Sequence, residues 1–158
     1  MLYFFKCHYN ATTENDRLVL DLISLGIVCE DGREFYAERE GFDWATASEG
    51  LTAPRLRQDG EPLAEIKRQL RRFMNEDPRV ELWALDGTLE AFTLLTMLVD
   101  PSRPSHWPRH YRDVMDLASA EGLTRLELPR QPIQPHDALE DAEWCRHVHD
   151  FIVGRPAR

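Results

Sequence analysis

Two polar side chains near the C-terminus have the types and spacing of a hydrolytic site. The segment PHDALEDAEWCRHVHDFI places His136 just before an expected helix over 137–153 and Asp141 five residues further on. A histidine can act as a general base, and a carboxylate can hold a hard metal ion. The same stretch also fits a structural pattern, because Asp137 and Glu140 form the D-x-x-E of a capping box. On this segment alone, the capping interpretation is the stronger one.

Further candidates lie near the N-terminus and in the middle of the chain. An apolar start is followed by Lys6, Cys7 and His8, and Glu90 stands in GTLEAFTLL. If the first segment is a strand, Lys6 and His8 share one face and Cys7 lies on the other, because side chains alternate along a strand. Asp86 precedes the helix that carries Glu90, and we expect it to cap that helix.

Strands and helices must bring these residues together. Strands are expected at the N-terminus and over 18–29, 34–38 and 80–85, with a hairpin turn at EDG over 30–32 and an insertion, NATTENDR, over 10–17. Helices are expected over 43–50, 62–75, 87–98, 111–121 and 137–153, and a short strand or extended segment over 123–128. This order predicts an α/β class, and 158 residues suit a single domain over 1–158.

The composition excludes several classes of protein. The formal net charge of −9 argues against a general polyanion binder, since such a domain repels phosphate at long range. No apolar run reaches the length of about 18 residues that a membrane span needs, so we expect no membrane partner. The three cysteines form no CxxC pair and the start lacks the features of a signal peptide, which predicts a cytoplasmic protein.

Taken together, HDALEDA, LISLGIVCEDGREFYA and VELWALDGTLEAFTLL resemble the DEDDh 3′–5′ exonucleases, the RNase T-like branch of the ribonuclease H-like fold. More narrowly, the chain is similar to the small mycobacterial-type polyadenylate-specific exoribonucleases. The resemblance covers most of the chain and is weakest over 100–135. It implies a mixed sheet flanked by helices. It also implies four carboxylates that hold two Mg or Mn ions, with a histidine as general base toward the attacking water.

The resemblance assigns roles to individual residues. His136 matches the general base and Asp141 the last carboxylate, while Glu90 stands where the second motif has an aspartate. The first motif, Asp-x-Glu, is replaced by Lys6 and His8. The substitution of Glu for Asp at residue 90 adds a methylene, which can shift a metal ligand by more than the ~0.5 Å that catalytic sites tolerate.

These replacements change the charge of the expected site. With a neutral His8, the residues Lys6, His8, Glu90 and Asp141 carry a net charge of −1, which cannot neutralise two magnesium ions. We expect Lys6 to replace the metal electrostatically by pairing with Asp141 and Glu90, so that bound Mg or Mn is absent or weak. The chain would then be a pseudoenzyme, a degenerate 3′–5′ exoribonuclease that still binds RNA or single-stranded nucleic-acid 3′ ends, or a protein partner.

Three alternatives stay open. The first is an active metal-dependent 3′–5′ exoribonuclease whose site is rebuilt from His136, Glu90, Asp141 and one further acid, for which the candidates are Asp86, Glu14 and Asp16. The second is a zinc site formed by His8, His136 and Asp141, to which the positive charge of Lys6 is the objection. The third is a protein-interaction scaffold with no nucleic-acid role, which the negative net charge supports mildly.

A basic helix face and the aromatic residues have two interpretations each. Arg68, Arg71 and Arg72, with Lys67, could form a phosphate-binding rim, but a solvated helix face is the favoured interpretation. We expect Trp83 and Trp144 to pack in the core or at its rim rather than to stack on bases.

Overall fold

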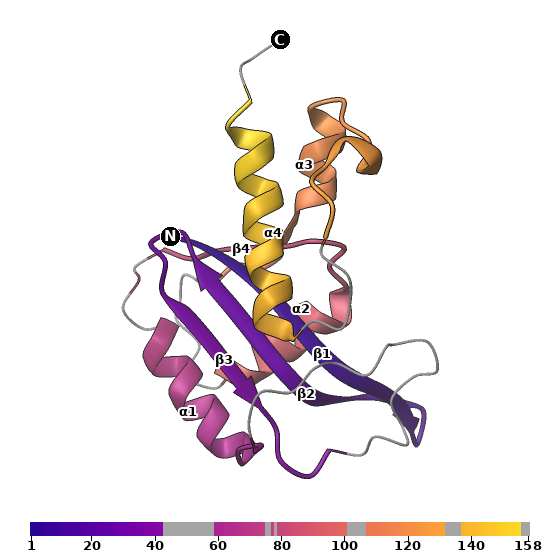
Figure 1. Ribbon diagram of the computed structural model, residues 1–158. Helices are drawn as coiled ribbons and strands as arrows, with labels where there is room; N and C mark the ends of the chain where they lie inside the picture. The colour runs from indigo at the N-terminus through magenta and orange to yellow at the C-terminus, as the bar shows by residue number, and fades with distance from the viewer. Residues whose placement is uncertain (43–58, 75–76, 78, 101–106, 132–136, 156–158) are drawn as a thin grey trace.

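The computed structural model describes residues 1–42, 59–74, 77, 79–100, 107–131 and 137–155 (Figure 1). Within them, the strands are β1 (Leu2–Glu14), β2 (Arg17–Cys29), β3 (Glu34–Glu38), β4 (Glu81–Ala84) and β5 (Arg112–Asp113). The helices are α1 (Leu63–Met74), α2 (Leu89–Val99), α3 (Val114–Ala120) and α4 (Ala138–Val153), with a short 3₁₀ helix at Arg125–Glu127.

The five strands form one mixed sheet in the order β3-β2-β1-β4-β5. β1 pairs antiparallel with β2, and β2 with β3, whereas β4 runs parallel to β1 and β5 parallel to β4. Within the described sheet, β2 therefore runs opposite to the other four strands, and β1 is the central strand. A mixed sheet whose strands alternate with helices confirms the predicted α/β class.

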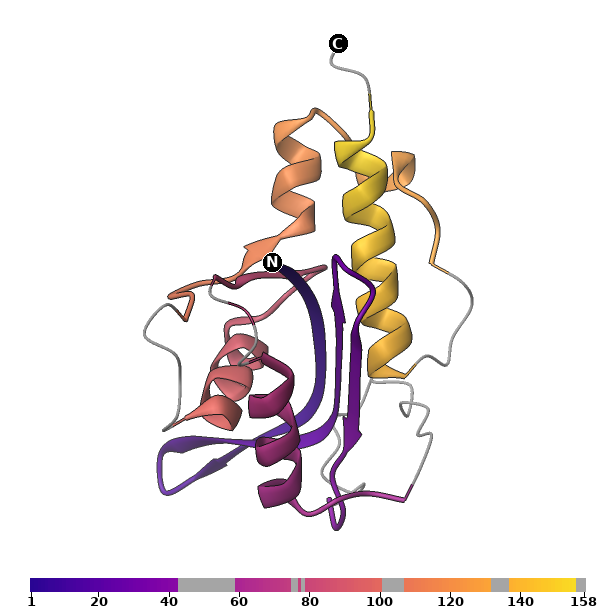
Figure 2. The ribbon, with the colours of Figure 1, turned by 90° about the vertical axis from the view of Figure 1, so that its left-hand side faces the viewer.

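Helices cover both faces of the sheet (Figure 2). Tyr3 and Phe5 of β1 belong to the core that includes buried residues of α1 and α2, whereas Phe4 belongs to a second core with α3 and α4. Consecutive residues of β1 contribute to opposite cores because side chains alternate across a strand. The even-numbered residues at the start of β1 therefore face α4.

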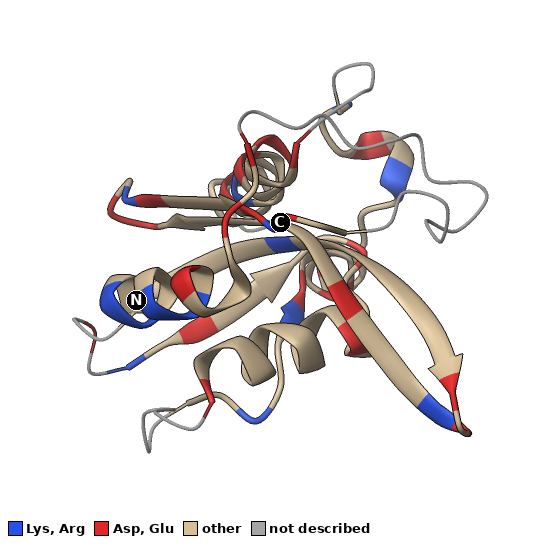
Figure 3. Cartoon of the chain, turned by 90° about the horizontal axis from the view of Figure 1, so that it is seen from below, with Lys and Arg blue, Asp and Glu red and all other residues tan. Residues whose placement is uncertain are grey.

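β1 and β2 form a longer hairpin than the sequence predicts. The expected insertion over 10–17 continues both strands instead, so that Glu14 pairs with Arg17 across a two-residue turn. The turn residues Asn15 and Asp16 have φ values of 48° and 59°, a left-handed conformation that these two residue types tolerate in tight hairpins. The pairing of β3 begins only at Ser24, and that of β4 ends at residue 4. Residues 11–20, here called the arm, thus project beyond the rest of the sheet (Figures 1 and 3).

Three further predictions meet different outcomes. The extended segment predicted over 123–128 is wrong, since Arg125–Glu127 form a 3₁₀ helix whose capping box joins Thr124 to Glu127. The helix predicted over 111–121 begins only at Val114, because Arg112–Asp113 pair with β4 as β5. The helix predicted over 43–50 lies outside the described residues.

Candidate functional site

β1 presents Lys6 and His8 on the face of the sheet that α4 covers. Phe4, two residues before Lys6, packs in one core cluster with Val148 of α4. Cys7 points to the opposite face, where its Sγ lies 3.7 Å from the carbonyl oxygen of Ala91 in α2. The structure therefore confirms that Lys6 and His8 lie on one face of β1 and Cys7 on the other.

His8 is hydrogen-bonded through both ring nitrogens. Its Nε2 lies 3.1 Å from Oδ2 of Asp141, and its Nδ1 lies 3.1 Å from Oγ of Ser24. A carboxylate only accepts, so Nε2 carries the proton of this hydrogen bond. The side chains of His8 and Asp141 are 10% and 12% exposed, and Ser24 is fully buried. His8 is thus held in one orientation, and both of its ring nitrogens are engaged by protein side chains.

Asp141 is engaged on both carboxylate oxygens. Oδ1 accepts a hydrogen bond of 2.6 Å from Nε2 of Gln131, while Oδ2 accepts the bond from His8. Asp141 also stands in the first turns of α4, where the positive end of the helix dipole stabilises a negative charge. These contacts stabilise the ionised carboxylate without a metal ion.

The start of α4 is fixed against β2. Asp137 is fully buried and accepts hydrogen bonds of 2.9 Å from the backbone N–H groups of Leu139 and Glu140. Glu140 reaches back to the backbone N–H of Asp137, which confirms the predicted capping box. A Cβ on Gly26 of β2 would lie 2.1 Å from the carbonyl oxygen of Ala138, so this close approach needs glycine. His136 lies outside the described residues.

Ser24 was not identified from the sequence. It pairs with His8 across β1 and β2, and with Glu38 across β2 and β3. These three residues therefore form a polar row across the sheet beneath α4, and Ser24 and Glu38 are both fully buried. The EDG turn sets the register of β2 against β3, so the pairing of Ser24 with Glu38 follows from the predicted hairpin. The pairing of Ser24 with His8 does not, because it belongs to the hairpin of β1 and β2, whose turn was not predicted.

Lys6 lines a small cavity between β1 and α4. The cavity has a volume of about 90 Å³, and Asp141, Asp86 and Gln131 also line it. Lys6 forms no ion pair with any residue that the structure describes, so it is His8, and not Lys6 as expected, that contacts Asp141. The charge of Lys6 still acts nearby: burial raises the pKa of the Cys7 thiol to about 12, against a lowering effect of Lys6.

A larger cavity opens on the other side of Lys6. It has a volume of about 310 Å³ and lies between residues 5–11 of β1 and the loop between β4 and α2. The cavity forms because the pairing of β1 with β4 ends at Phe4, after which the two strands separate. Tyr9 crosses its wall and its hydroxyl is 2.8 Å from Oγ1 of Thr88.

Comparison with known proteins identifies the chain's relatives. The chain matches no family model. It is 33% identical over 153 residues to 3′-5′ exoribonuclease Rv2179c of Mycobacterium tuberculosis strain ATCC 25618 / H37Rv, and the match covers 90% of this chain and 87% of the relative. The same figures hold for 3′-5′ exoribonuclease MT2234.1 of strain CDC 1551 / Oshkosh. The chain belongs to this 3′–5′ exoribonuclease family. Its mixed sheet with flanking helices is consistent with the ribonuclease H-like exonuclease fold.

The predicted second-motif residue, Glu90, lies on α2. Glu90 is partly buried at the second position of α2 and lies close enough to Tyr111 to act on its ionisation. Burial chiefly raises the pKa of Tyr111, and the charges of Asp113, Asp116 and Glu90 raise it further. Glu90 lines neither of the two cavities beside Lys6.

The three acids considered for a rebuilt exoribonuclease site are either paired with another residue or far from His8. Asp86 does not cap α2 as predicted; Thr88 does, with its hydroxyl oxygen 3.1 Å from the backbone N of Ala91. Asp86 instead lies in a turn with φ of 50° and forms an ion pair with Arg125. Glu14 and Asp16 stand at the end of the arm, and Glu14 is six residues beyond His8, roughly 20 Å along an extended strand.

The DEDDh resemblance implies a site for two metal ions, and the described side chains near Asp141 do not fit such a site. Within the described residues, no group of three or more His, Cys, Asp and Glu side chains could hold a metal ion. Magnesium needs hard oxygen ligands, but Asp141 faces an imidazole at 3.1 Å and lines the same small cavity as Lys6. A cation bound to Asp141 would have to displace the imidazole of His8 and would be repelled by the positive charge of Lys6.

Lys and Arg residues gather on α1 (Figure 3), and two of its arginines have partners. Arg68 forms an ion pair with Glu65, and Arg71 donates to the backbone carbonyl of Asp100 at 3.2 Å. Arg72 is exposed. α1 packs on the face of the sheet opposite α4. The phosphate-rim interpretation stays a prediction. No helix in the described part of the chain is long and apolar enough to cross a membrane.

Proposed function

We propose that this member of the exoribonuclease family has lost two-metal hydrolysis and binds RNA 3′ ends at the cavities beside Lys6. The observation that carries the proposal is the contact between His8 and Asp141, two positions where the DEDDh resemblance has metal ligands. The imidazole satisfies Asp141 where the family pattern has a carboxylate. The site is therefore a degenerate first motif in a retained scaffold.

Lys6 supplies the remaining affinity for RNA in this proposal. Lys6 lines both the 90 Å³ and the 310 Å³ cavity and forms no ion pair with a described residue, so a phosphate bound beside it would meet a positive charge. An ammonium group attracts a phosphate oxygen as the metal ions would, but it activates no water. The chain would thus bind a 3′ end without cleaving it. Mg or Mn would then be dispensable for binding.

A labelled oligoadenylate tests this proposal. We expect salt-sensitive binding in EDTA, no shortening of the strand in magnesium or manganese, and weaker binding for Lys6→Met. Arg79→Gln, which removes an exposed positive charge just before β4 and outside both the cavities and the basic face of α1, is the control and should bind as the wild type does. Shortening from the 3′ end that Asp141→Ala abolishes would show an active exoribonuclease with a rebuilt site. Neither binding nor shortening would favour a scaffold with a protein partner.

A further inference from the structure

We infer that a third cavity, on the far side of the small Lys6 cavity, binds a further nucleotide of the same RNA; this rests on the proposed function. The cavity has a volume of about 350 Å³ and lies between α3, α4 and the segment that follows the 3₁₀ helix. It is here called the Trp144 cavity. Its volume falls in the range of about 300–1,000 Å³ that small-molecule sites occupy.

One wall of the Trp144 cavity is apolar and belongs to the core beneath α4. Leu128 and Val148 are buried in that core, and Met115 and Trp144 pack against it from the cavity side. Trp144 is only partly buried, in keeping with the expected place at the rim of the core. An indole at the edge of an apolar pocket is a surface on which any base can stack. This wall suits the planar part of a nucleotide.

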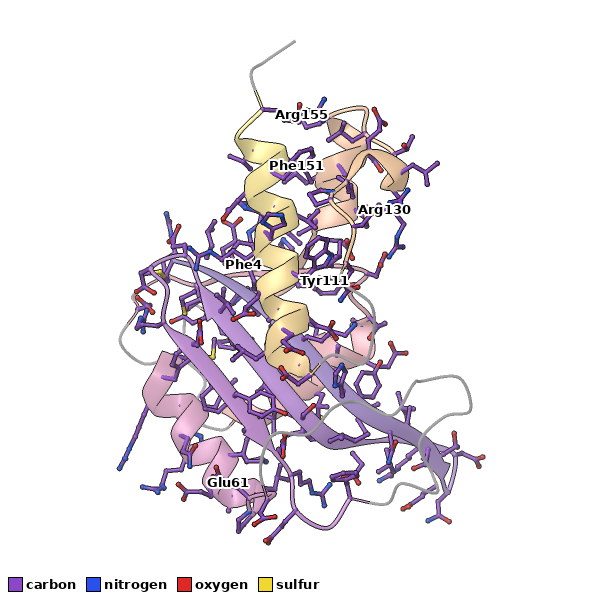
Figure 4. The ribbon with its side chains drawn as sticks, in the orientation of Figure 1. Phe4, Glu61, Tyr111, Arg130, Phe151 and Arg155 are labelled. Atoms are coloured by element: carbon purple, nitrogen blue, oxygen red, sulfur yellow. The ribbon has the colours of Figure 1, made fainter. Side chains whose placement is uncertain are left out.

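The opposite rim is positively charged. Arg125 and Arg130 line the cavity, and no acidic residue does. Arg125 is paired with Asp86, whereas Arg130 is exposed and forms no ion pair with any described residue. Figure 4 shows Arg130 on the segment that leads from the 3₁₀ helix back toward α4. A guanidinium group binds phosphate oxygens through two parallel hydrogen bonds.

Charge and continuity select RNA as the occupant. In a chain of net charge −9, a rim that carries Arg130 without an ion pair to a described residue, and no acidic lining residue, favours an anion over an apolar peptide. The Trp144 cavity shares Leu85, Gln131 and Trp144 with the small cavity at Lys6, and that cavity shares Phe5, Lys6 and Asp86 with the larger one. The three cavities therefore adjoin in series, with Lys6 in the middle. In this inference, one RNA strand passes from one cavity to the next.

Binding of a fluorescein-labelled hexa-adenylate in EDTA, followed by anisotropy, tests the inference. Trp144→Leu should weaken binding roughly tenfold, because it removes the stacking surface and keeps an apolar side chain. Arg130→Gln should weaken binding and reduce the slope of log K against log salt by about 0.7, the value for one phosphate contact on a single strand. Arg79→Gln is the matched control, since Arg79 is exposed beyond the opposite end of β4.

The outcomes separate the two proposals. If Trp144→Leu and Arg130→Gln bind as the wild type does while Lys6→Met binds more weakly, the Trp144 cavity is not a nucleotide site and the proposed function stands. If the wild type does not bind at all, both proposals are wrong. Sedimentation of the same proteins covers a third case: a dimer that Trp144→Leu dissociates, with unchanged RNA binding, would show that a second copy occupies the cavity and would overturn the inference. Arg130 is exposed, so its variant tests the site without disturbing the core.

Discussion

The double substitution Lys6→Asp, His8→Glu should convert the site into one that binds manganese. It changes the charge at residue 6 from +1 to −1 and at residue 8 from 0 to −1, beside a carboxylate that is only 12% exposed. Without metal, the variant loses the hydrogen bond of 3.1 Å from His8 to Asp141, which costs about 1.5–3 kcal/mol for a bond to a charged group. Repulsion between the new carboxylates and Asp141 lowers its stability further.

Manganese should reverse this loss in the variant alone. At a concentration of 100 times Kd, a ligand stabilises the folded state by about 2.7 kcal/mol. For a chain of this size that corresponds to a rise in Tm of about 5–11 °C, at roughly 2–4 °C for each kcal/mol. The wild type should show no such rise, because Lys6 repels the cation. Calorimetric scans with manganese and with EDTA measure both values.

A control and two possible results would test the reasoning behind this prediction. Lys67→Asp, His147→Glu changes the charge by the same amount away from the site, so a rise in Tm there would indicate nonspecific binding. A rise in the wild type equal to that of the variant would refute the idea that Lys6 and His8 exclude a metal ion from this site. No rise in the double variant would mean that the loss extends beyond the first motif, with Glu90 as the next position to restore to aspartate.

Two further predictions concern stability and are checked by denaturant unfolding. Gly26→Ala should destabilise the protein by about 1–3 kcal/mol and disturb the start of α4, because the new methyl group would meet the backbone of Ala138. Burial raises the pKa of Asp77, but hydrogen bonds from Tyr3 and Arg33 outweigh it, and the pKa is lowered overall. A lowered folded pKa stabilises the protein above the unfolded value of about 3.9 and this contribution is lost as the pH falls through the folded pKa, so Asp77→Asn should show a weaker loss of stability in acid than the wild type.

The sequence predicts much of the fold because its apolar runs have clear periods. The strands over 18–29 and 34–38 and the helices over 62–75 and 137–153 agree with β2, β3, α1 and α4 to within a few residues. The arm was not predicted, although Thr12 and Thr13 are β-branched and Asn15–Asp16 suit a tight turn. The arm was missed because this stretch is polar and lacks the apolar run by which the other strands were predicted. β5 is two residues long and depends wholly on its pairing with β4.

The candidate site is less accessible to sequence reasoning than the fold. Residue spacing places Lys6 and His8 on one face, and the resemblance places Asp141 near them. Which of the two contacts Asp141 depends on the register of β1 against β2, which sets Ser24 opposite His8 and fixes the ring. The pairing of Asp86 with Arg125 depends on a contact between segments 39 residues apart, which no local pattern encodes.

The arm also divides the molecule by local stability. A two-stranded ribbon is marginally stable in water, and no third strand among the described residues pairs with residues 11–20. Amide hydrogens in the arm should therefore exchange through local opening, well before those of β1 near Phe4 and Phe5. Ala11 and Tyr9 line the larger cavity, so opening of the arm widens that cavity without global unfolding. The hydrogen bond between Tyr9 and Thr88 ties β1, at the base of the arm, to the start of α2 beside that cavity.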